Sequence, residues 1–366
     1  MQPRIDWWNP VMNAREKQLL CEVVESNFPN DGHYTTAFEQ KIAELCDVPY
    51  AVGVTSGTVA IFLGLVACGV GVGDEVIVPD ITFIATANAV TLTGAKPIFV
   101  DIDPATFCID PACVKTAITP RTKAIVPVHI SGRAAALPAL LDIAREHGLR
   151  IVEDAAEALG SYVHDRALGT LGNVGCFSFT ANKLITTGQG GMVVTKDATL
   201  YRRLRELKDH DRPAQNTGGA DEHVSVGYNF KFTNLQAALG LAQLESFAVR
   251  QEHQRHIFRL YQELLSGVAR VRLPGFNLER GECPLWVDAL VEDRDGLHDY
   301  LLARHIHTRK FWYPLHTQPP YRCADQQFPM SMQVSSGALW LPSALTLTDD
   351  DVSFVCQHIR GWAKDH

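Results

Sequence analysis

A single lysine, Lys183, lies between an apolar strand-like run and a glycine-rich turn. The run Cys176–Phe179 precedes it, and the turn Gly188–Gly191 follows it. Packing on both sides would hold the side chain near apolar walls, where desolvation disfavours the ammonium form and makes the amine a nucleophile toward carbonyls. Upstream, the strand-like run Ile151–Asp154 ends in two carboxylates. A lysine that forms a Schiff base and an acid at a strand end are the pair that a pyridoxal phosphate (PLP) enzyme needs. Taken alone, Lys183 would be interpreted as an ordinary loop lysine, so other motifs must decide.

A second motif, Thr55–Thr58, lies between an apolar run and a helical stretch. Its backbone N–H groups and hydroxyls would face a phosphate at the helix N-terminus, where the helix dipole favours negative charge. Taken alone, the motif is explained as well by Ser56 or Thr58 acting as a plain helix N-cap. In an α/β sheet, however, ligands gather at the C-terminal ends of the strands. Three such ends carry a phosphate cradle, a carboxylate and a lysine, which together favour a cofactor site.

The charges of PLP suggest roles for the neighbouring side chains. A carboxylate paired with the pyridine nitrogen would keep that nitrogen protonated, so that the ring can accept electrons. Glu153 and Asp154 are both candidates, but strand alternation sends them to opposite faces and only one can reach the ring. A structural salt bridge is the competing role for Asp154. Phe83 follows a strand end and would stack on the pyridine ring, unless it is an ordinary core phenylalanine.

The order of apolar runs predicts the elements that position these residues. From residue 50 to about 195, short strands alternate with helical stretches, as in a parallel sheet covered by helices on both faces. The expected strands are Tyr50–Val54, Glu75–Pro79, Pro97–Asp101, Ala124–His129, Leu149–Glu153, Gly175–Phe179 and Met192–Thr195. The expected helices are Val59–Cys68, Ala85–Thr93, Leu137–His147, Thr199–Leu207 and one long helix over 234–265. Beyond it, strands over 284–291 and 308–313, a helix over 294–304 and a terminal helix over 348–362 suggest a small α+β unit. Residues 212–224 have the most loop-like composition.

Length and composition limit the possible classes of protein. With 366 residues, 46% of them hydrophobic, the chain is expected to form two domains: a large PLP-binding domain over 1–248 and a small C-terminal domain over 249–366. A net charge of −8 argues against a nucleic-acid surface. We find no apolar stretch long enough to cross a membrane and no apolar signal region. Nine cysteines without a Cys-x-x-Cys pair suggest reduced thiols in the cytoplasm, and His305 and His307 belong to no recognisable metal set.

These motifs, in their order and spacing, resemble the DegT/DnrJ/EryC1/StrS family of PLP-dependent aminotransferases, which act mainly on nucleotide-linked keto sugars. The resemblance runs from about Phe38 to about Pro342. The segments that carry it are TSGTVA (55–60), GDEVIVP (73–79), TFIATANAV (82–90), GAKPIFVDID (94–103), VEDAAEALGS (152–161), NKLITTGQGGMVVT (182–195) and GYNFKFTN (227–234). The family implies a fold-type-I architecture: a doubly wound, mostly parallel seven-stranded sheet with a smaller C-terminal α+β domain. It also implies a homodimer with two shared active sites.

The resemblance assigns roles by matching position. Lys183 matches the Schiff-base lysine, Asp154 the residue that binds the pyridine nitrogen, and Phe83 the ring-stacking aromatic. The phosphate contacts match Gly57, Thr58 and Ser178, next to Ser56. Glu157 occupies the position near the 3′ oxygen of the cofactor, where many members have glutamine. Asn229 and Lys231 match residues that reach the phosphate site of the neighbouring subunit, and the sequence does not decide which of the two makes the contact.

The segment 308–321 resembles the part of the small domain by which members acting on GDP-linked sugars approach their substrate. Arg309 and Lys310 suit a diphosphate, and Tyr313 and His316 suit sugar hydroxyls. The alternative is a strand and turn with a solvated basic pair. The resemblance implies L-glutamate as amino donor and favours a GDP-linked 4-keto-6-deoxy sugar as acceptor, with UDP- or dTDP-linked sugars as alternatives. Two further alternatives are less favoured. A PLP-dependent sugar dehydratase of the family would carry histidine in place of Lys183. A non-catalytic regulator on the same fold would not need the intact set of cofactor residues.

Overall fold

The structure, a computed structural model, describes residues 4–213, 223–323 and 327–365. Most of the segment predicted to be the most loop-like, 212–224, lies outside the described residues. None of the helices in the described ranges is both long and apolar enough to cross a membrane.

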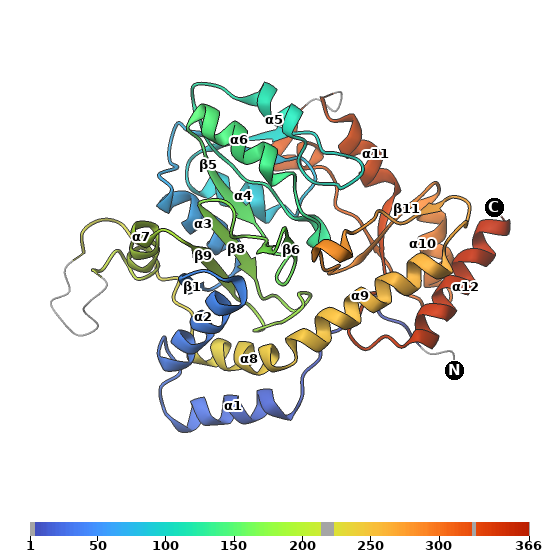
Figure 1. Ribbon diagram of the computed structural model, residues 1–366, viewed down its shortest axis with the longest axis horizontal. Coiled ribbons are helices and arrows are strands. Elements are labelled where there is room, and N and C mark those ends of the chain that lie inside the picture. The colour runs from blue at the N-terminus through green and yellow to red at the C-terminus, as the bar shows by residue number, and fades with distance from the viewer. Residues whose placement is uncertain (1–3, 214–222, 324–326, 366) are drawn as a thin grey trace.

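A seven-stranded sheet forms the centre of the larger part of the molecule (Figure 1). Its strands are β1 (Tyr50–Val54), β2 (Glu75–Pro79), β3 (Lys96–Val100), β4 (Thr122–Ile125), β5 (Arg150–Asp154), β8 (Val174–Ser178) and β9 (Gly191–Thr195). The order across the sheet is β1-β9-β8-β5-β4-β2-β3. The neighbours from β8 to β3 are parallel, whereas β9 is antiparallel to both β1 and β8. All seven expected strands are present, and the predicted mostly parallel sheet is confirmed.

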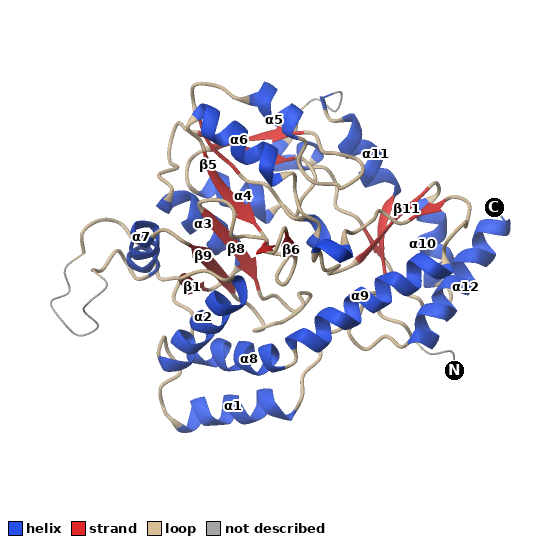
Figure 2. Ribbon diagram, viewed as in Figure 1, coloured by secondary structure: helices blue, strands red, loops and turns tan. Residues whose placement is uncertain are grey.

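Alternation along the strands divides the core into two apolar layers. In β2, for example, Val76 and Val78 pack in one layer and Ile77 in the other, because successive strand residues point to opposite faces. Helices α3 (Gly57–Ala67), α4 (Ala85–Leu92) and α7 (Ala198–Lys208) contribute to the first layer. Helices α2 (His33–Cys46), α5 (Pro111–Ala117), α6 (Leu137–His147) and α8 (Asn234–Glu245) contribute to the second layer. The sheet is therefore doubly wound, with helices flanking the strands in Figure 2.

Smaller elements complete this part of the molecule. Helix α1 (Ala14–Glu25) packs against α8, and β6 (Tyr162–Val163) pairs with β7 (Arg166–Ala167) in a short hairpin. These elements were not anticipated from the sequence.

The C-terminal elements surround a second, antiparallel sheet in the order β10-β11-β13-β12. They are β10 (Val271–Arg272), β11 (Val287–Val291), α10 (Arg294–Leu302), β12 (Arg309–Lys310), α11 (Pro329–Gly337), β13 (Ala338–Leu341) and α12 (Asp349–Asp365). Helix α9 (Phe247–Leu264) runs from the side of the large sheet to these elements (Figure 1). The N-terminal residue Ile5 also packs in their apolar cluster and forms a β-bridge with Ile306. The division at 248/249 stays a prediction.

Two elements differ from the expectation. The long helix over 234–265 is interrupted at Ser246, where φ −105° and ψ 10° end α8 before α9 begins. The Ser246 hydroxyl donates to the carbonyl of Gln243 and accepts from Arg250 Nε, so local side-chain bonds stabilise the break. The expected strand over 308–313 shrinks to β12, because its partner β13 begins at Ala338 and offers no backbone for pairing beyond Phe311.

Candidate active site

A cavity of about 380 Å³ opens where β1, β2, β5 and β8 end at their C-terminal edges. Parallel strands bring these ends together, as expected for an α/β sheet. The predicted residues that line the cavity are Ser56, Gly57, Thr58, Phe83, Asp154, Glu157, Ser178, Lys183 and Arg309. The structure therefore gathers into one place side chains that are up to 253 positions apart in the chain.

Lys183 projects its amine into this cavity from the turn between β8 and β9. Its Nζ lies 3.4 Å from Glu157 Oε1 and 4.8 Å from the centroid of the Trp286 ring. The side chain is 12% exposed, so it is held near packed walls, as predicted, but can still be reached from the cavity. An amine in such a place can attack a carbonyl without first leaving an apolar core.

The choice between Glu153 and Asp154 is decided by their contacts. Glu153 is fully buried on the opposite face, where its carboxylate lies 3.0 Å from His129 Nε2 and accepts the N–H groups of a nearby turn. Asp154 lines the cavity. One of its oxygens accepts from the Thr86 hydroxyl at 2.8 Å and the other from the N–H of Ala156 at 3.1 Å. Of the two acids, only Asp154 can face a ligand in the cavity.

Burial dominates the electrostatics of the two acids that line the cavity. It raises the pKa of Asp154 and that of Glu157 above their ordinary values, although Lys183 opposes both shifts by favouring the charged forms. Glu157 also accepts from the N–H of Ser131 at 2.9 Å. A cationic group placed beside Asp154, such as a protonated pyridine nitrogen, would compensate its desolvation.

The first turn of α3 and the end of β8 form a narrow cradle. A Cβ atom on Gly57 would lie 2.7 Å from Ser178 Cβ, and one on Gly191 would lie 2.3 Å from the carbonyl oxygen of Ser56. The Ser56 hydroxyl accepts from the N–H of Val59 at 3.2 Å, so Ser56 is an N-cap, as the simpler interpretation held. The free N–H groups of this helix end, together with the hydroxyls of Thr58 and Ser178, suit a phosphate group. The residues present thus fit PLP at both of its ends.

Two of the remaining predicted residues lie at the rim of the cavity. Phe83 is 52% exposed, which an ordinary core phenylalanine would not be. The Arg309 guanidinium lies 4.9 Å from the ring centroid of Trp7 and 5.5 Å from that of Trp340. Burial lowers its pKa, while Glu157 opposes that shift. Arginine is the residue best suited to a partly desolvated anion site with aromatic walls.

The other three residues predicted in the 308–321 segment, which are Lys310, Tyr313 and His316, do not line the cavity. Lys310 pairs with Asp295 at 2.7 Å and lines, with the exposed Tyr313, a neighbouring groove of about 260 Å³. The expected contact of His316 with sugar hydroxyls gains no support from this geometry and stays a prediction. His316 is 0% exposed, and its Nδ1 lies 2.6 Å from Asp80 Oδ2. Its backbone N–H also donates to that carboxylate, so His316 fastens the segment to the end of β2.

Asn229 and Lys231 lie outside the cavity. Lys231 forms an ion pair with Asp209 and a β-bridge with Val54, and Asn229 bridges Asp209 through the backbone. Their predicted contact with a second subunit stays a prediction. Among the described residues, no three His, Cys, Asp or Glu side chains gather in a way that could hold a metal ion.

Several residues that line the cavity were not among the predicted ones, and Thr86, Trp286 and Trp312 are three of them. Thr86 donates to Asp154 from the first turn of α4, and no local pattern in the sequence indicates that contact. Trp286 and Trp312 also line the cavity, but they come from the C-terminal part of the chain, and no local pattern indicates that they return to the sheet.

This architecture and this cavity place the protein among the PLP-dependent aminotransferases of fold type I. More particularly, the sequence matches the DegT/DnrJ/EryC1/StrS aminotransferase family over residues 10–360, and the chain belongs to that family. It is similar to the GDP-perosamine synthase of Escherichia coli O157:H7, with 36% identity over 98% of both chains. It is also similar to the dTDP-4-dehydro-2,3,6-trideoxy-D-glucose 4-aminotransferase of Saccharopolyspora spinosa, with 34% identity over 99% of this chain and 97% of the relative. Among solved structures, DesV from S. venezuelae superposes with a TM-score of 0.93 at 32% identity, over 99% of both chains.

Proposed function

We propose that this aminotransferase moves the amino group of L-glutamate to C4 of a nucleotide-linked 4-keto-6-deoxy sugar. The favoured acceptor is GDP-4-keto-6-deoxy-mannose, and the product is then GDP-perosamine, a building block for surface polysaccharides or glycosides. The observation that carries the proposal is similarity over 96–98% of the chain to GDP-perosamine synthases from three organisms, at 35–37% identity. A second candidate is amination of a UDP- or dTDP-linked keto sugar, at C3 or C4, which relatives at 34–36% identity favour.

The residues of the cavity divide the work of amino transfer. Lys183 would hold the cofactor and would carry a proton on its Nζ during the transfer. When bound, PLP would supply a ring that accepts electrons from the reacting carbon. Asp154 would keep the ring nitrogen protonated, and Phe83 would help to orient the ring. Ser178 and the first turn of α3 bind the phosphate.

The acceptor sugar enters the same cavity after the donor has left, since one cofactor serves both substrates in turn. Arg309 is the cation of the 308–321 segment that lines the cavity, and we assign it to the diphosphate. Tyr313 lies along the way in, at the neighbouring groove. Lys310 is engaged with Asp295 and contributes less.

A second copy of the chain completes each site in this proposal. Asn229 or Lys231 reaches the phosphate group bound by the partner, so the working unit is a homodimer with two shared sites. Mixing an inactive Lys183→Ala chain with an inactive Lys231→Ala/Asn229→Ala chain tests this arrangement, because heterodimers would regain one intact site. No regained activity in the mixture would refute the sharing of sites.

The experiment that tests the activity is a glutamate-dependent amination screen of GDP-, UDP- and dTDP-linked 4-keto-6-deoxy sugars, with product mass as readout. NMR of the product separates transfer to C4 from transfer to C3. The proposal expects the GDP-linked sugar to be converted fastest, and faster conversion of a UDP- or dTDP-linked sugar would establish the second candidate.

The same screen can be run with matched variants of two neighbouring cations. Arg309→Met is expected to raise the KM for the sugar nucleotide by about tenfold or more, as for loss of a charged contact. Lys310→Met serves as the control and is expected to change KM by less than about threefold, because surface ion pairs contribute little. The reverse order would move the diphosphate to the outer groove.

A further inference from the structure

The free edge of strand β1 is closed by charged side chains at Gly53. Strand β1 stands first in the order of the sheet and, within the part of the chain that the structure describes, β9 is the only strand that pairs with it. The N–H of Gly53 donates to Glu39 Oε1 at 2.7 Å, and its carbonyl accepts from Lys208 Nζ at 3.3 Å. Both backbone groups therefore face away from β9. An edge strand normally leaves such groups unpaired or open to another chain.

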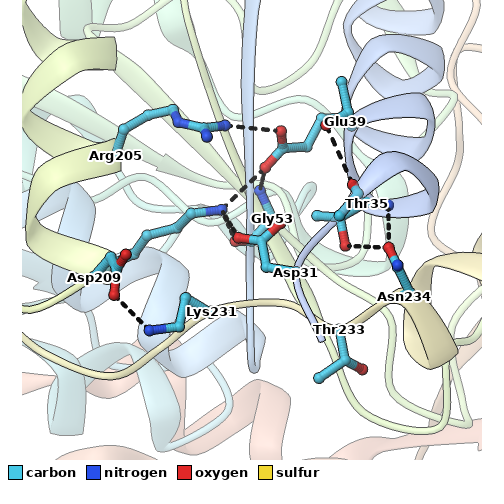
Figure 3. Close-up of polar contacts among 12 residues, drawn as sticks. Asp31, Thr35, Glu39, Gly53, Arg205, Asp209, Lys231, Thr233 and Asn234 are labelled. Carbon is cyan, nitrogen blue, oxygen red and sulfur yellow. Dashed lines mark hydrogen bonds and ion pairs between the residues drawn. The ribbon is translucent and has the colours of Figure 1, made fainter. Parts of the chain in front are cut away.

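Glu39 and Lys208 belong to a compact ion cluster. Lys208 Nζ lies 3.2 Å from Glu39 Oε1 and 3.3 Å from Asp31 Oδ2, and Arg205 Nη1 lies 3.2 Å from Glu39 Oε2. Figure 3 shows Arg205 joined to Glu39, which in turn contacts the backbone of Gly53, with Asp31 next to Gly53. The cluster holds two cations and two anions, which offsets the cost of burying a lysine whose side chain is only 2% exposed.

The position of Gly53 gives this cluster a consequence for the site. Gly53 is three residues before Ser56, the N-cap of α3, so it lies directly before the turn that forms the cradle. Val54, the last residue of β1, forms a β-bridge with Lys231 on the same free edge. On the other edge, Gly191 lies so close to Ser56 that an added Cβ would come within 2.3 Å of the Ser56 carbonyl oxygen. The turn is thus held from the β9 side by close packing and from the outer side by the ion cluster.

We propose that Glu39 and Lys208 are positioning residues for the cofactor's phosphate. They act through Gly53: by binding both of its backbone groups, they fix the end of β1 and with it the N–H groups of the first turn of α3. This inference depends on the proposed role of that turn in binding phosphate. Neither side chain lines the cavity, so neither would contact a cofactor bound there.

The test compares two ligands that differ only in the phosphate. Apoprotein is titrated with PLP and with pyridoxal, which has the same ring and aldehyde, and each Kd is measured from the change in ligand absorbance. Lys208→Met is expected to raise the Kd for PLP by about tenfold, equivalent to about 1.4 kcal/mol. The Kd for pyridoxal is expected to stay within about twofold, because pyridoxal has no phosphate for the turn to bind. A general loosening of the fold would instead weaken the binding of both ligands.

Two further variants make the outcome decisive. Ser178→Ala removes a group assigned to the phosphate directly. If it leaves the ratio of the two Kd values unchanged, the phosphate site itself is wrongly placed. If it changes the ratio and Lys208→Met does not, the positioning role is refuted. Glu75→Gln is the matched control, since Glu75 is also a buried carboxylate paired with an arginine, but at the N-terminal end of β2. The ratio of its Kd values for PLP and pyridoxal should equal that of the wild type.

The single lysine variant leaves Glu39 and Asp31 with one cation fewer, and its folding is checked by thermal unfolding. If it does not fold, Glu39→Gln replaces it, because a glutamine oxygen can still accept from Gly53 while the ion pairs are lost. That variant is expected to raise the Kd for PLP by about threefold, and not that for pyridoxal, since only part of the charged contact is removed. Equal loss for both ligands, or failure of both variants to fold, would show that the cluster serves the fold alone.

Discussion

Replacement of Asp154 by asparagine tests the chemistry of the site most directly. In the structure, the Thr86 hydroxyl donates to one carboxylate oxygen and the N–H of Ala156 donates to the other. An asparagine oxygen can keep the bond from Ala156, and its NH₂ can face Thr86, because a hydroxyl can accept as well as donate. The side chain should therefore stay in place and lose only its charge.

The expected cost follows from the burial of the site. A neutral amide cannot keep the ring nitrogen protonated, and loss of a buried charged hydrogen bond typically costs about 2–4 kcal/mol. This corresponds to a fall in kcat of about 30- to 1000-fold. The assay measures the rate at which the PLP-loaded variant reacts with L-glutamate, normalised to the cofactor content read from the absorbance spectrum.

The matched variant is Glu153→Gln, the neighbouring acid on the opposite face. One amide oxygen cannot accept all the N–H groups that the Glu153 carboxylate accepts, so this variant should unfold at a lower temperature. Its rate per bound cofactor should stay near that of the wild type. A kcat of Asp154→Asn within about threefold of the wild type at full cofactor loading would refute the role of Asp154 in catalysis.

Further predictions concern the lysine, the cradle and the pH dependence. Lys183→Ala should lower the rate of amino transfer by at least about 10⁴-fold, because it removes both the attachment and the proton carrier, and borohydride should no longer fix the cofactor to the chain as judged by mass. Gly57→Ala should raise the Kd for PLP by about tenfold or more, since its Cβ would press on Ser178. The control Gly71→Ala should leave the Kd unchanged, because a Cβ there would meet open space. Equal effects of the two variants would contradict the proposed cradle. Burial raises the pKa of Glu157, so its protonated form is favoured in the folded state, and the stability that it contributes is lost as pH rises through the folded pKa. Apoprotein of Glu157→Gln should therefore gain in Tm relative to the wild type as pH rises above the ordinary glutamate pKa, and a constant difference in Tm from pH 4 to 8 would count against this assignment.

The elements that carry the chemistry could be predicted from the sequence because each has a strong local pattern. The strands of the large sheet have short apolar runs, and β1, β5 and β8 run in the same direction, so the ends after Val54, Val152 and Ser178 lie at one edge of the sheet. The positions of the cradle and of Lys183 at this edge of the sheet follow from that arrangement. The preference for Asp154 over Glu153 came from the family resemblance, and their contacts now give its physical basis.

The remaining features depend on tertiary contacts that leave no local signal. His316 has the same polar character as a ligand-binding residue, and its burial depends on distant partners such as Asp80 and Phe328. The break at Ser246 lies within a sequence of good helix formers, where periodicity predicts continuity. Trp286 reaches the cavity from the C-terminal sheet, and the ion cluster at Gly53 combines side chains from α2 and α7 that are 169 positions apart. Such contacts are set by packing and not by propensity.

The close packing around the cradle has a practical consequence for altering the enzyme by directed evolution. Gly57 and Gly191 leave no room for a single added carbon, so libraries that randomise these positions would consist almost entirely of inactive clones. Tyr313, by contrast, is exposed and lines the neighbouring groove, not the cofactor cavity, so it should tolerate changes in size. Variation confined to this position should change which sugar nucleotide is accepted while the machinery that handles the cofactor is inherited intact.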